Sequence, residues 1–464
     1  MVIIMDATTA ARRPLLTRDK SFYKTVVRLM TAIIFQNLIS YSVNMADNIM
    51  LGMYSQNALS GAATVNQIQF MVQQLTLAVG DSIVVIGGQY WGKKKSAEIR
   101  LLTFYALAIG IIFAAGVFIW TCFFPAGVLS IFTENADYIA EGVKYLKLIC
   151  FTYPLYIIST ILLSSLRSVE TVHLALKVSL VSLLVNIGIN YLLIFGKLGF
   201  PELGIFGAAV GTLVSRILEL VIILFYIIFV DKKLKLFCLD RIKYSKSLLF
   251  DFLRVLWPSA LSNFLWSVAT PIQTSVLGHL EDDAIAANSV ATTIYQYVKI
   301  IAIGEASASA VIIGKTIGEN PDDDTKIKDY SRTLQILYII FGIILGFALF
   351  FLRIPFLSLY DLSDNALRIA DGMLIVLSFA MVGMSYQMPA SVGIVKGGGD
   401  VKFIMYMNMI STWGIVMPLT FISAYLLHMP AVFIVAVLNS DQVFKCLPVA
   451  IHCNRYKWIK RIAK

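Results

Sequence analysis

The chain has 464 residues, of which 58% are hydrophobic and only 14% are charged, and its formal net charge is +10. A mean hydropathy of +0.79 excludes a soluble globular protein of this length and indicates a polytopic membrane protein. The basic residues lie in short loops between apolar segments, so they indicate membrane topology, and we expect no nucleic-acid partner.

The first 24 residues are predicted to form a cytosolic tail. They carry basic residues around a short apolar patch without a cleavage-like site, so no signal peptide is expected. The cysteines fall in or beside apolar segments without paired spacing, which predicts neither a disulfide framework nor a zinc site. They are Cys122, Cys150, Cys238, Cys446 and Cys453.

Twelve windows of about 20 or more apolar residues predict twelve transmembrane helices, because a helix of that length crosses a bilayer. The windows are residues 26–54, 60–90, 99–123, 139–164, 173–196, 204–230, 249–277, 285–315, 330–352, 367–394, 402–426 and 430–452. The predicted fold class is therefore an all-α polytopic membrane protein.

The distribution of charge predicts the orientation of these helices. The loops after spans two, six and eight are basic, and those after spans three and seven are acidic. Because basic loops stay in the cytoplasm, we expect a multi-pass protein of a bacterial cytoplasmic (inner) membrane with both termini cytoplasmic.

An internal repeat divides the chain into two halves. Leu51-Gly52 recurs 226 positions later as Leu277-Gly278, and Gly92 recurs at the same offset as Gly318. Six spans per half give both halves the same orientation, so a duplication predicts two six-helix lobes around a central cleft. We expect an N-lobe over residues 25–230, a cytosolic inter-lobe loop over 231–248, a C-lobe over 249–452 and a basic cytosolic tail over 453–464.

Asp47 is the principal candidate for function. It lies near the outer end of the apolar segment 26–54, and an acid at the bilayer centre costs roughly 2.5 to 3.5 kcal/mol. Tyr41, Asn44 and Asn48 fall at helical spacing with it and form one polar stripe on an apolar helix. Such a stripe favours a cavity over lipid.

Spans one, two, seven and eight all carry polar stripes of this kind. A single polar residue is explained by interhelical hydrogen bonding, but stripes this long favour a water-filled cavity between the halves. The predicted cavity-lining residues are Tyr41, Asn44, Gln69, Gln73, Trp266 and Tyr295.

Asn186 and Asn190 in span five stand four residues apart and share a helix face. Their oxygens suit coordination of a hard cation or a hydrogen bond with Asp47, and a purely structural pair fits the spacing equally well.

Other charges inside the spans favour structural roles. Asp81 and Glu305 occupy matching small-acid-small triplets and are interpreted as structural partners, with a proton relay as the alternative. Arg216 and Glu219 are three residues apart and are expected to neutralise each other.

Five motifs in order resemble the multidrug and toxic compound extrusion (MATE) family, in its bacterial type, over residues 24 to 452. They are Asp47-x4-Gly52 with Ala58; Gln89-Tyr90-Trp91-Gly92; Asn186-x3-Asn190-Tyr191-x3-Phe195-Gly196; Phe200-Pro201-Glu202-Leu203-Gly204-x2-Gly207-Ala208-Ala209; and Lys396-Gly397-Gly398-Gly399-Asp400. The resemblance implies a secondary antiporter that exports organic cations and other amphipathic compounds against Na+ or H+. It implies that Asp47 couples transport to the ion, with Asn186, Asn190 and Thr212 around it.

The chain also departs from that family. NorM-like members carry an acid in span seven and another in span ten, where the nearest residues here are Asn263, Phe264 and Trp266, then Ser385 and Tyr386. A carboxylate cation site in the second half is therefore not expected, and neither is proline-linked bending of span one.

We weighed three alternatives to an antiporter. A lipid-linked oligosaccharide flippase of a related fold needs a cationic cleft, and only Lys299 lies clearly among the polar stripes. An enzyme needs a nucleophile, metal or general-base cluster, which the four scattered histidines do not form, and a receptor does not explain one isolated acid. We therefore expect a non-enzymatic transporter without cofactors, with no metal beyond Na+ at the coupling site. Its partners are small molecules and the bilayer, and it is expected to act as a monomer.

Overall fold

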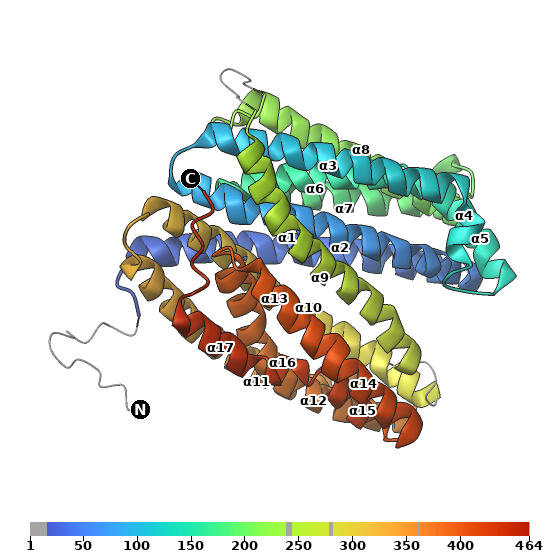
Figure 1. Cartoon of the computed structure of the whole chain (residues 1–464). Coiled ribbons are helices and arrows are strands. Elements are labelled where there is room, and N and C mark those ends of the chain that lie inside the picture. Colours follow the sequence, from blue (N-terminus) through green and yellow to red (C-terminus); the bar gives the residue numbers. More distant parts are fainter. Residues whose placement is uncertain (1–15, 238–243, 278–281, 361, 464) are drawn as a thin grey trace.

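The computed structural model describes residues 16–237, 244–277, 282–360 and 362–463. This part of the chain is helical with short connections and contains no strand. Figure 1 shows two helical lobes that meet at one end and diverge toward the other, with both termini at the end where they meet. The all-helical two-lobe prediction is confirmed.

The N-lobe is built from helices of both short and membrane-spanning length. In chain order they are α1 (Lys20–Tyr54), α2 (Gln56–Gly92), α3 (Ser96–Phe123), α4 (Pro125–Leu129), α5 (Ala136–Ile149), α6 (Thr152–Ser168), α7 (His173–Ile194), η1 (Lys197–Gly199), α8 (Ile205–Phe225) and η2 (Tyr226–Val230). Asp19 begins α1 as its N-cap, because its carboxylate accepts hydrogen bonds from the backbone N–H groups of Ser21 and Phe22.

The C-lobe repeats this plan with more interruptions. Its helices are α9 (Lys246–Leu277), α10 (Asp282–Glu319), α11 (Thr325–Leu357), α12 (Asp364–Met388), η3 (Pro389–Lys396), α13 (Val401–Asn408), η4 (Met409–Val416), α14 (Met417–Phe421), η5 (Ile422–Leu426), α15 (Ala431–Leu438), α16 (Asp441–Phe444) and α17 (Cys446–Arg455). Pro389 begins η3 and Pro418 is the second residue of α14, where a missing backbone N–H loosens the helical ladder.

Eleven helical segments of the described chain are long and apolar enough to cross a membrane. The predicted span 139–164 is a pair instead, because α5 and α6 meet at a 51° bend, and counting that pair as one span gives twelve. The protein is therefore a multi-pass membrane protein. Span one is a continuous helix over Lys20–Tyr54, as expected for a segment without proline.

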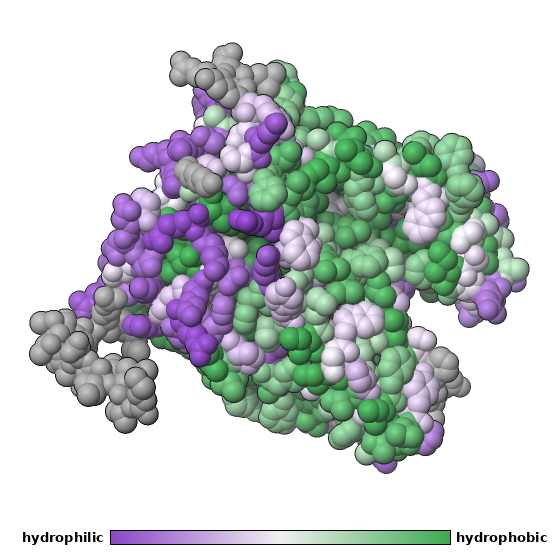
Figure 2. All heavy atoms as spheres, in the orientation of Figure 1, coloured by the Kyte–Doolittle hydropathy of each residue, from purple (hydrophilic) through white to green (hydrophobic). Residues whose placement is uncertain are grey.

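The lobes join at the end that carries the termini. Helix α2 packs on α10 and α9, and α1 packs on α10. The first half of α1 enters a buried apolar cluster with the C-lobe, in which Phe22, Leu29 and Ile33 meet Val311 and Tyr330. Figure 2 shows the molecule hollowed between the lobes at the opposite end. The structure is thus closed on the terminus side and open on the other.

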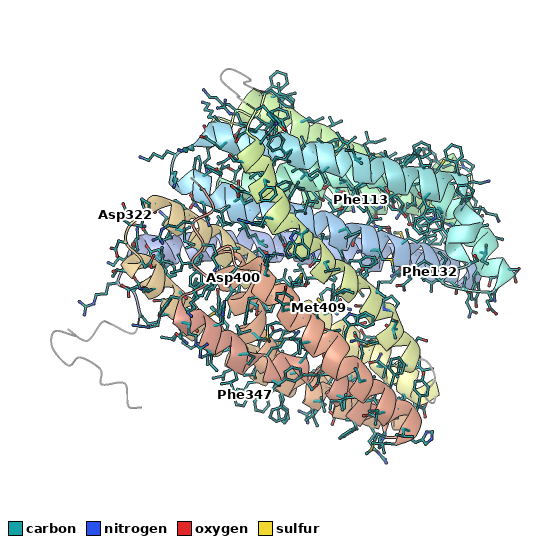
Figure 3. The ribbon with its side chains drawn as sticks, in the orientation of Figure 1. Phe113, Phe132, Asp322, Phe347, Asp400 and Met409 are labelled. Carbon is teal, nitrogen blue, oxygen red and sulfur yellow. The ribbon has the colours of Figure 1, made fainter. Side chains whose placement is uncertain are left out.

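The two ends of the molecule also differ in chemistry. Figure 2 shows hydrophilic residues gathered at the terminus end and an apolar surface over the lobes beside it. In Figure 3, Asp322 and Asp400 lie at the terminus end, whereas Phe113 and Phe347 lie along the two lobes. The apolar girdle between polar ends is what a bilayer requires.

Candidate functional site

Asp47 sits on α1 with its carboxylate turned toward α7 of the same lobe. The Asn190 side-chain amide donates to Asp47 Oδ1 at 2.5 Å. Asn190 Nδ2 also donates to Asn186 Oδ1 at 3.3 Å, and Asn186 Nδ2 reaches Thr212 Oγ1 at 3.5 Å, which is a weak contact. The structure therefore brings the four predicted residues together from helices α1, α7 and α8.

One acceptor in this cluster has no partner. Asn190 is fully buried, and its Oδ1 makes no hydrogen bond with any described group. A buried amide oxygen without a donor is costly, and its usual explanation is an unseen water, ion or functional role. Because it belongs to the residue that binds Asp47, the cluster offers a carboxylate and amide oxygens, which are ligands of hard cations.

A pocket of about 380 Å³ opens beside Asp47 within the N-lobe. It is lined by Val43, Asn44, Asp47, Asn48, Leu51, Ala62, Asn66, Gln69, Tyr145, Thr212 and Arg216. Two predicted cavity residues, Asn44 and Gln69, belong to it. Tyr145 and Ala62, which the sequence analysis did not single out, complete its wall.

The other four predicted cavity residues lie outside this pocket. Tyr41 is exposed, Gln73 is half-buried, and the Trp266 ring packs on Phe70 of α2 with centroids 5.4 Å apart. Tyr295, which was expected to line the cavity, is buried in the C-lobe core, and its hydroxyl donates to Met384 Sδ at 3.1 Å.

The cation in the pocket is already neutralised. Arg216 Nη1 lies 2.7 Å from Glu219 Oε2, as the three-residue spacing predicted, and its guanidinium lies over the Tyr156 ring. The excess charge of the N-lobe pocket is therefore the one on Asp47.

A family model described as MatE matches residues 32–192 and 258–422, which is more than half of the chain. The chain belongs to the MATE family. The two matched segments begin 226 residues apart (258 minus 32), the offset of the repeat, so the internal duplication is confirmed. Members of this family are transporters, not enzymes, and need no cofactor.

Three known proteins illustrate the likeness. The chain is 24% identical over 442 residues to the probable multidrug resistance protein NorM of Thermotoga maritima, covering 94% of this chain and 93% of the relative. It is 21% identical over 427 residues to the probable multidrug resistance protein YoeA of Bacillus subtilis, covering 89% and 90%. The crystal structure of the eukaryotic MATE transporter AtDTX14 superposes with a TM-score of 0.83 at 17% identity, covering 95% and 97%, which shows a shared fold.

The C-lobe of this MATE transporter holds an acid that the sequence analysis missed. The last span breaks between α15 and α16, and Asp441 begins the short helix that follows. Its carboxylate accepts from Gln442 Nε2 at Oδ1 and from Lys445 Nζ at Oδ2, both at 2.8 Å. An Asp-x3-Lys pair after Asn439-Ser440 in an apolar span was the available signal.

Ion pairs between the lobes close the terminus side. Lys396 Nζ, in the C-lobe, lies 2.7 Å from Asp81 Oδ2 on α2, and Lys315 Nζ on α10 lies 2.9 Å from Glu170 Oε1. Asp81, Arg167 and Lys396 also line an inter-lobe pocket of about 300 Å³. Asp81 thus has an ion-pair partner in the other lobe, Lys396.

Glu305, the repeat counterpart of Asp81, has no such partner. It is 3% exposed, and neither carboxylate oxygen is hydrogen-bonded to a described residue. The two matching acids therefore differ in environment.

Proposed function

We propose that this transporter exports amphipathic organic compounds, organic cations among them, by antiport against H+ or Na+, and that Asp47 couples the two fluxes. The observation that carries the proposal is the Asp47–Asn190 hydrogen bond of 2.5 Å, made beside an unpartnered Asn190 oxygen and a polar pocket. A membrane helix retains such an acid only where its charge is used.

Coupling follows from competition for one charge. A proton neutralises the Asp47 carboxylate, whereas Na+ is held by that carboxylate together with amide oxygens of Asn186 and Asn190. Either ion drives the cycle only if the ion-bound form favours a conformation that releases substrate. Substrate enters and leaves as the closed terminus side and the open opposite side exchange roles.

We place the protein in a bacterial inner membrane with both termini cytoplasmic. The basic loops support this orientation, and with it the observed conformation opens outward. Reporter fusions at both termini and in the 231–248 loop are expected to report the cytoplasm, and a fusion there that reports the periplasm would overturn the orientation.

The flippase alternative finds little support in the pocket. A pyrophosphate needs several free cations, but Arg216 is paired with Glu219 at 2.7 Å and Lys299 lies outside this pocket. The names of the multidrug resistance relatives favour small amphipathic substrates instead.

The deciding experiment measures dye efflux in inverted membrane vesicles with Na+ and pH gradients imposed separately. Asp47→Asn keeps the size of the side chain and removes its charge, so it should insert normally and lose gradient-driven efflux. Asp137→Asn, at an exposed position of α5, is the matched control and should behave as the wild type. Near-normal efflux by Asp47→Asn at equal membrane abundance would remove Asp47 from the mechanism.

A further inference from the structure

Lys299 carries an uncompensated charge in the membrane interior of the C-lobe. It lies on α10 within the candidate span Asp283–Glu319 and is half-buried. No hydrogen bond or ion pair joins its ammonium to another described residue. The ammonium lies over the Trp266 ring, with Nζ 5.5 Å from the ring centroid. An intramembrane ammonium without a counter-ion is costly, which points to a function for the charge.

The aromatic ring beside this ammonium is accessible. Trp266 on α9 is 41% exposed, and it meets Phe70 of α2, so the ring lies where the two lobes face each other. An indole face next to a cation accommodates a planar ring that bears a negative group. The Lys299 ammonium lies over this ring, so Lys299 and Trp266 present a charge and an aromatic surface at one place.

Asp441, the buried acid of the last span, does not serve as the missing counter-ion, because no ion pair joins it to Lys299. Both of its oxygens are already bound, one by Gln442 and the other by Lys445. Asp441 and Lys445 neutralise each other, and the charge of Lys299 remains in excess.

The two lobes thus carry opposite excess charges in their interiors. In the N-lobe pocket, Arg216 and Glu219 cancel and Asp47 remains, whereas beside Trp266 in the C-lobe the cation Lys299 remains. The unpartnered acid Glu305 lies six residues further along α10. A purely cationic substrate would find an attractive partner in the first lobe and a repulsive one in the second.

We propose that Lys299 and Trp266 form a receptor for the carboxylate and the planar ring of an aromatic substrate. This inference rests on the proposed export function and assigns to these two residues the recognition of an anionic group on an aromatic substrate. The carboxylate provides the charge-assisted hydrogen bonds that the ammonium lacks, and the ring stacks on Trp266.

The test uses two dyes with the same ring system. Rhodamine 110 carries a free carboxylate, and rhodamine 123 carries its methyl ester. Binding to purified protein in detergent and gradient-driven efflux from vesicles are measured for the wild type and for Lys299→Gln, Lys299→Arg and Trp266→Ala. Lys299→Gln should lower the affinity for rhodamine 110 relative to rhodamine 123 by about tenfold or more. Lys299→Arg should retain most of that preference, and Trp266→Ala should weaken both dyes.

The outcomes separate this inference from the function on which it rests. If Lys299→Gln changes the affinity for both dyes equally, the ammonium serves the fold or binds a lipid phosphate, and the proposed receptor is wrong. Failure of the wild type to bind rhodamine 110 would overturn it as well. If the wild type binds rhodamine 110 through Lys299 but exports neither dye, the receptor stands and the export function falls.

Discussion

Gly88 on α2 and Gly314 on α10 face each other where the two lobes close, and they are repeat equivalents 226 positions apart. A Cβ added to Gly88 would lie 3.5 Å from the Cα atom of Gly314. One turn further on, the equivalents Gly92 and Gly318 press against the carbonyl oxygens of Lys315 and Gln89. Two small-xxx-small motifs thus cross backbone to backbone near the ends of α2 and α10, on the terminus side.

This crossing predicts that added methyl groups prevent closure. Gly92→Ala and Gly318→Ala each place a Cβ against a carbonyl oxygen of the other lobe, with an overpacking cost of about 1 to 3 kcal/mol. The terminus side should therefore open more often. A cysteine introduced at Val85 in a cysteine-free background should react faster with an impermeant maleimide added from that side.

Gly116→Ala on α3 is the matched control, because no atom lies within 4 Å of its added Cβ. If the cysteine at position 85 reacts at the wild-type rate in both Gly92→Ala and Gly318→Ala, close packing of the glycines is not needed for closure.

The ion pair between Asp81 and Lys396 should stabilise the same closed state. Removing one partner leaves the other charge half-satisfied at the interface, and the cost should be about 1 to 3 kcal/mol, because Asp81 is partly exposed. Lys396→Met and Asp81→Asn should each favour opening, and the double variant should cost less than their sum. A double-mutant cycle on maleimide reactivity measures this coupling, and additive effects would exclude the pair as a lock.

Residue type and spacing were enough to predict the helices, the duplication and the core of the candidate site. Asp47 can be identified from the sequence because hydrocarbon solvates no anion. Asn186 and Asn190 can be identified because their four-residue spacing places both amides on one helix face. The contact of 2.5 Å between Asp47 and Asn190 shows that this face meets α1. The repeat also predicts that Gly52 superposes on Gly278 when the two lobes are overlaid. This stays a prediction, because Gly278 lies outside the described residues.

Tertiary packing decided what the sequence did not. Tyr295 shares a polar stripe with Lys299, yet the helix turns it toward Met384 inside the C-lobe. The partner of Asp81 is 315 residues away, and no local pattern selects Lys396 over Arg167. Periodicity identifies a face of a helix but not the neighbour that the face meets.

Asn190 should act on transport by positioning Asp47. Asn190→Leu keeps the volume and removes the amide that donates to the carboxylate, a charge-assisted bond of about 1.5 to 3 kcal/mol. The affinity for Na+ should then fall about tenfold or more, because the amide oxygen of Asn190 is lost as a ligand as well, so the KM for Na+ rises while membrane abundance stays normal. Initial efflux rates over a series of Na+ concentrations measure this, with Asn57→Leu at an exposed position of α2 as a control. An unchanged ion dependence would show that the bond is structural only.

The low pKa of Asp19 predicts that its hydrogen bond with Tyr330, which joins the two lobes, contributes the same stability over the working pH range. The Tyr330 hydroxyl of α11 donates to Asp19 Oδ2 at 2.5 Å, and together with the bond from Ser21 it lowers the pKa of that carboxyl to about 2. A depressed pKa adds stability above the unfolded value of 3.8, and this stability is lost as the pH falls through about 2. Between about pH 5 and 8 the contribution is therefore constant.

Asp19→Asn keeps an N-cap residue of similar strength, so the efflux of wild type and variant should run parallel from about pH 5 to 8. A pH profile that changes shape with this substitution would show that Asp19 titrates in the working range and refute the assignment.

The chain after α17 crosses from the C-lobe to the N-lobe and should restrain opening on the terminus side. Trp458 is fully buried against Gly398, and beyond it the side chain of Gln89 on α2 bonds the backbone three times: Nε2 donates to the Lys460 oxygen, and Oε1 accepts from the N–H groups of Ile462 and Ala463.

Because each of these three bonds contributes about 0.5 to 1.5 kcal/mol, breaking them should shift the equilibrium toward opening by about tenfold or more. Gln89→Leu and deletion of residues 457–464 should therefore both lengthen the distance between spin labels at Lys94 and Lys402 in pulsed electron resonance. Asn454→Leu removes a side-chain bond to the Ala450 oxygen within α17 and is the control that should leave this distance unchanged. If Gln89→Leu and the deletion give the distance distribution of the wild type, the crossing segment follows the lobes and does not hold them together.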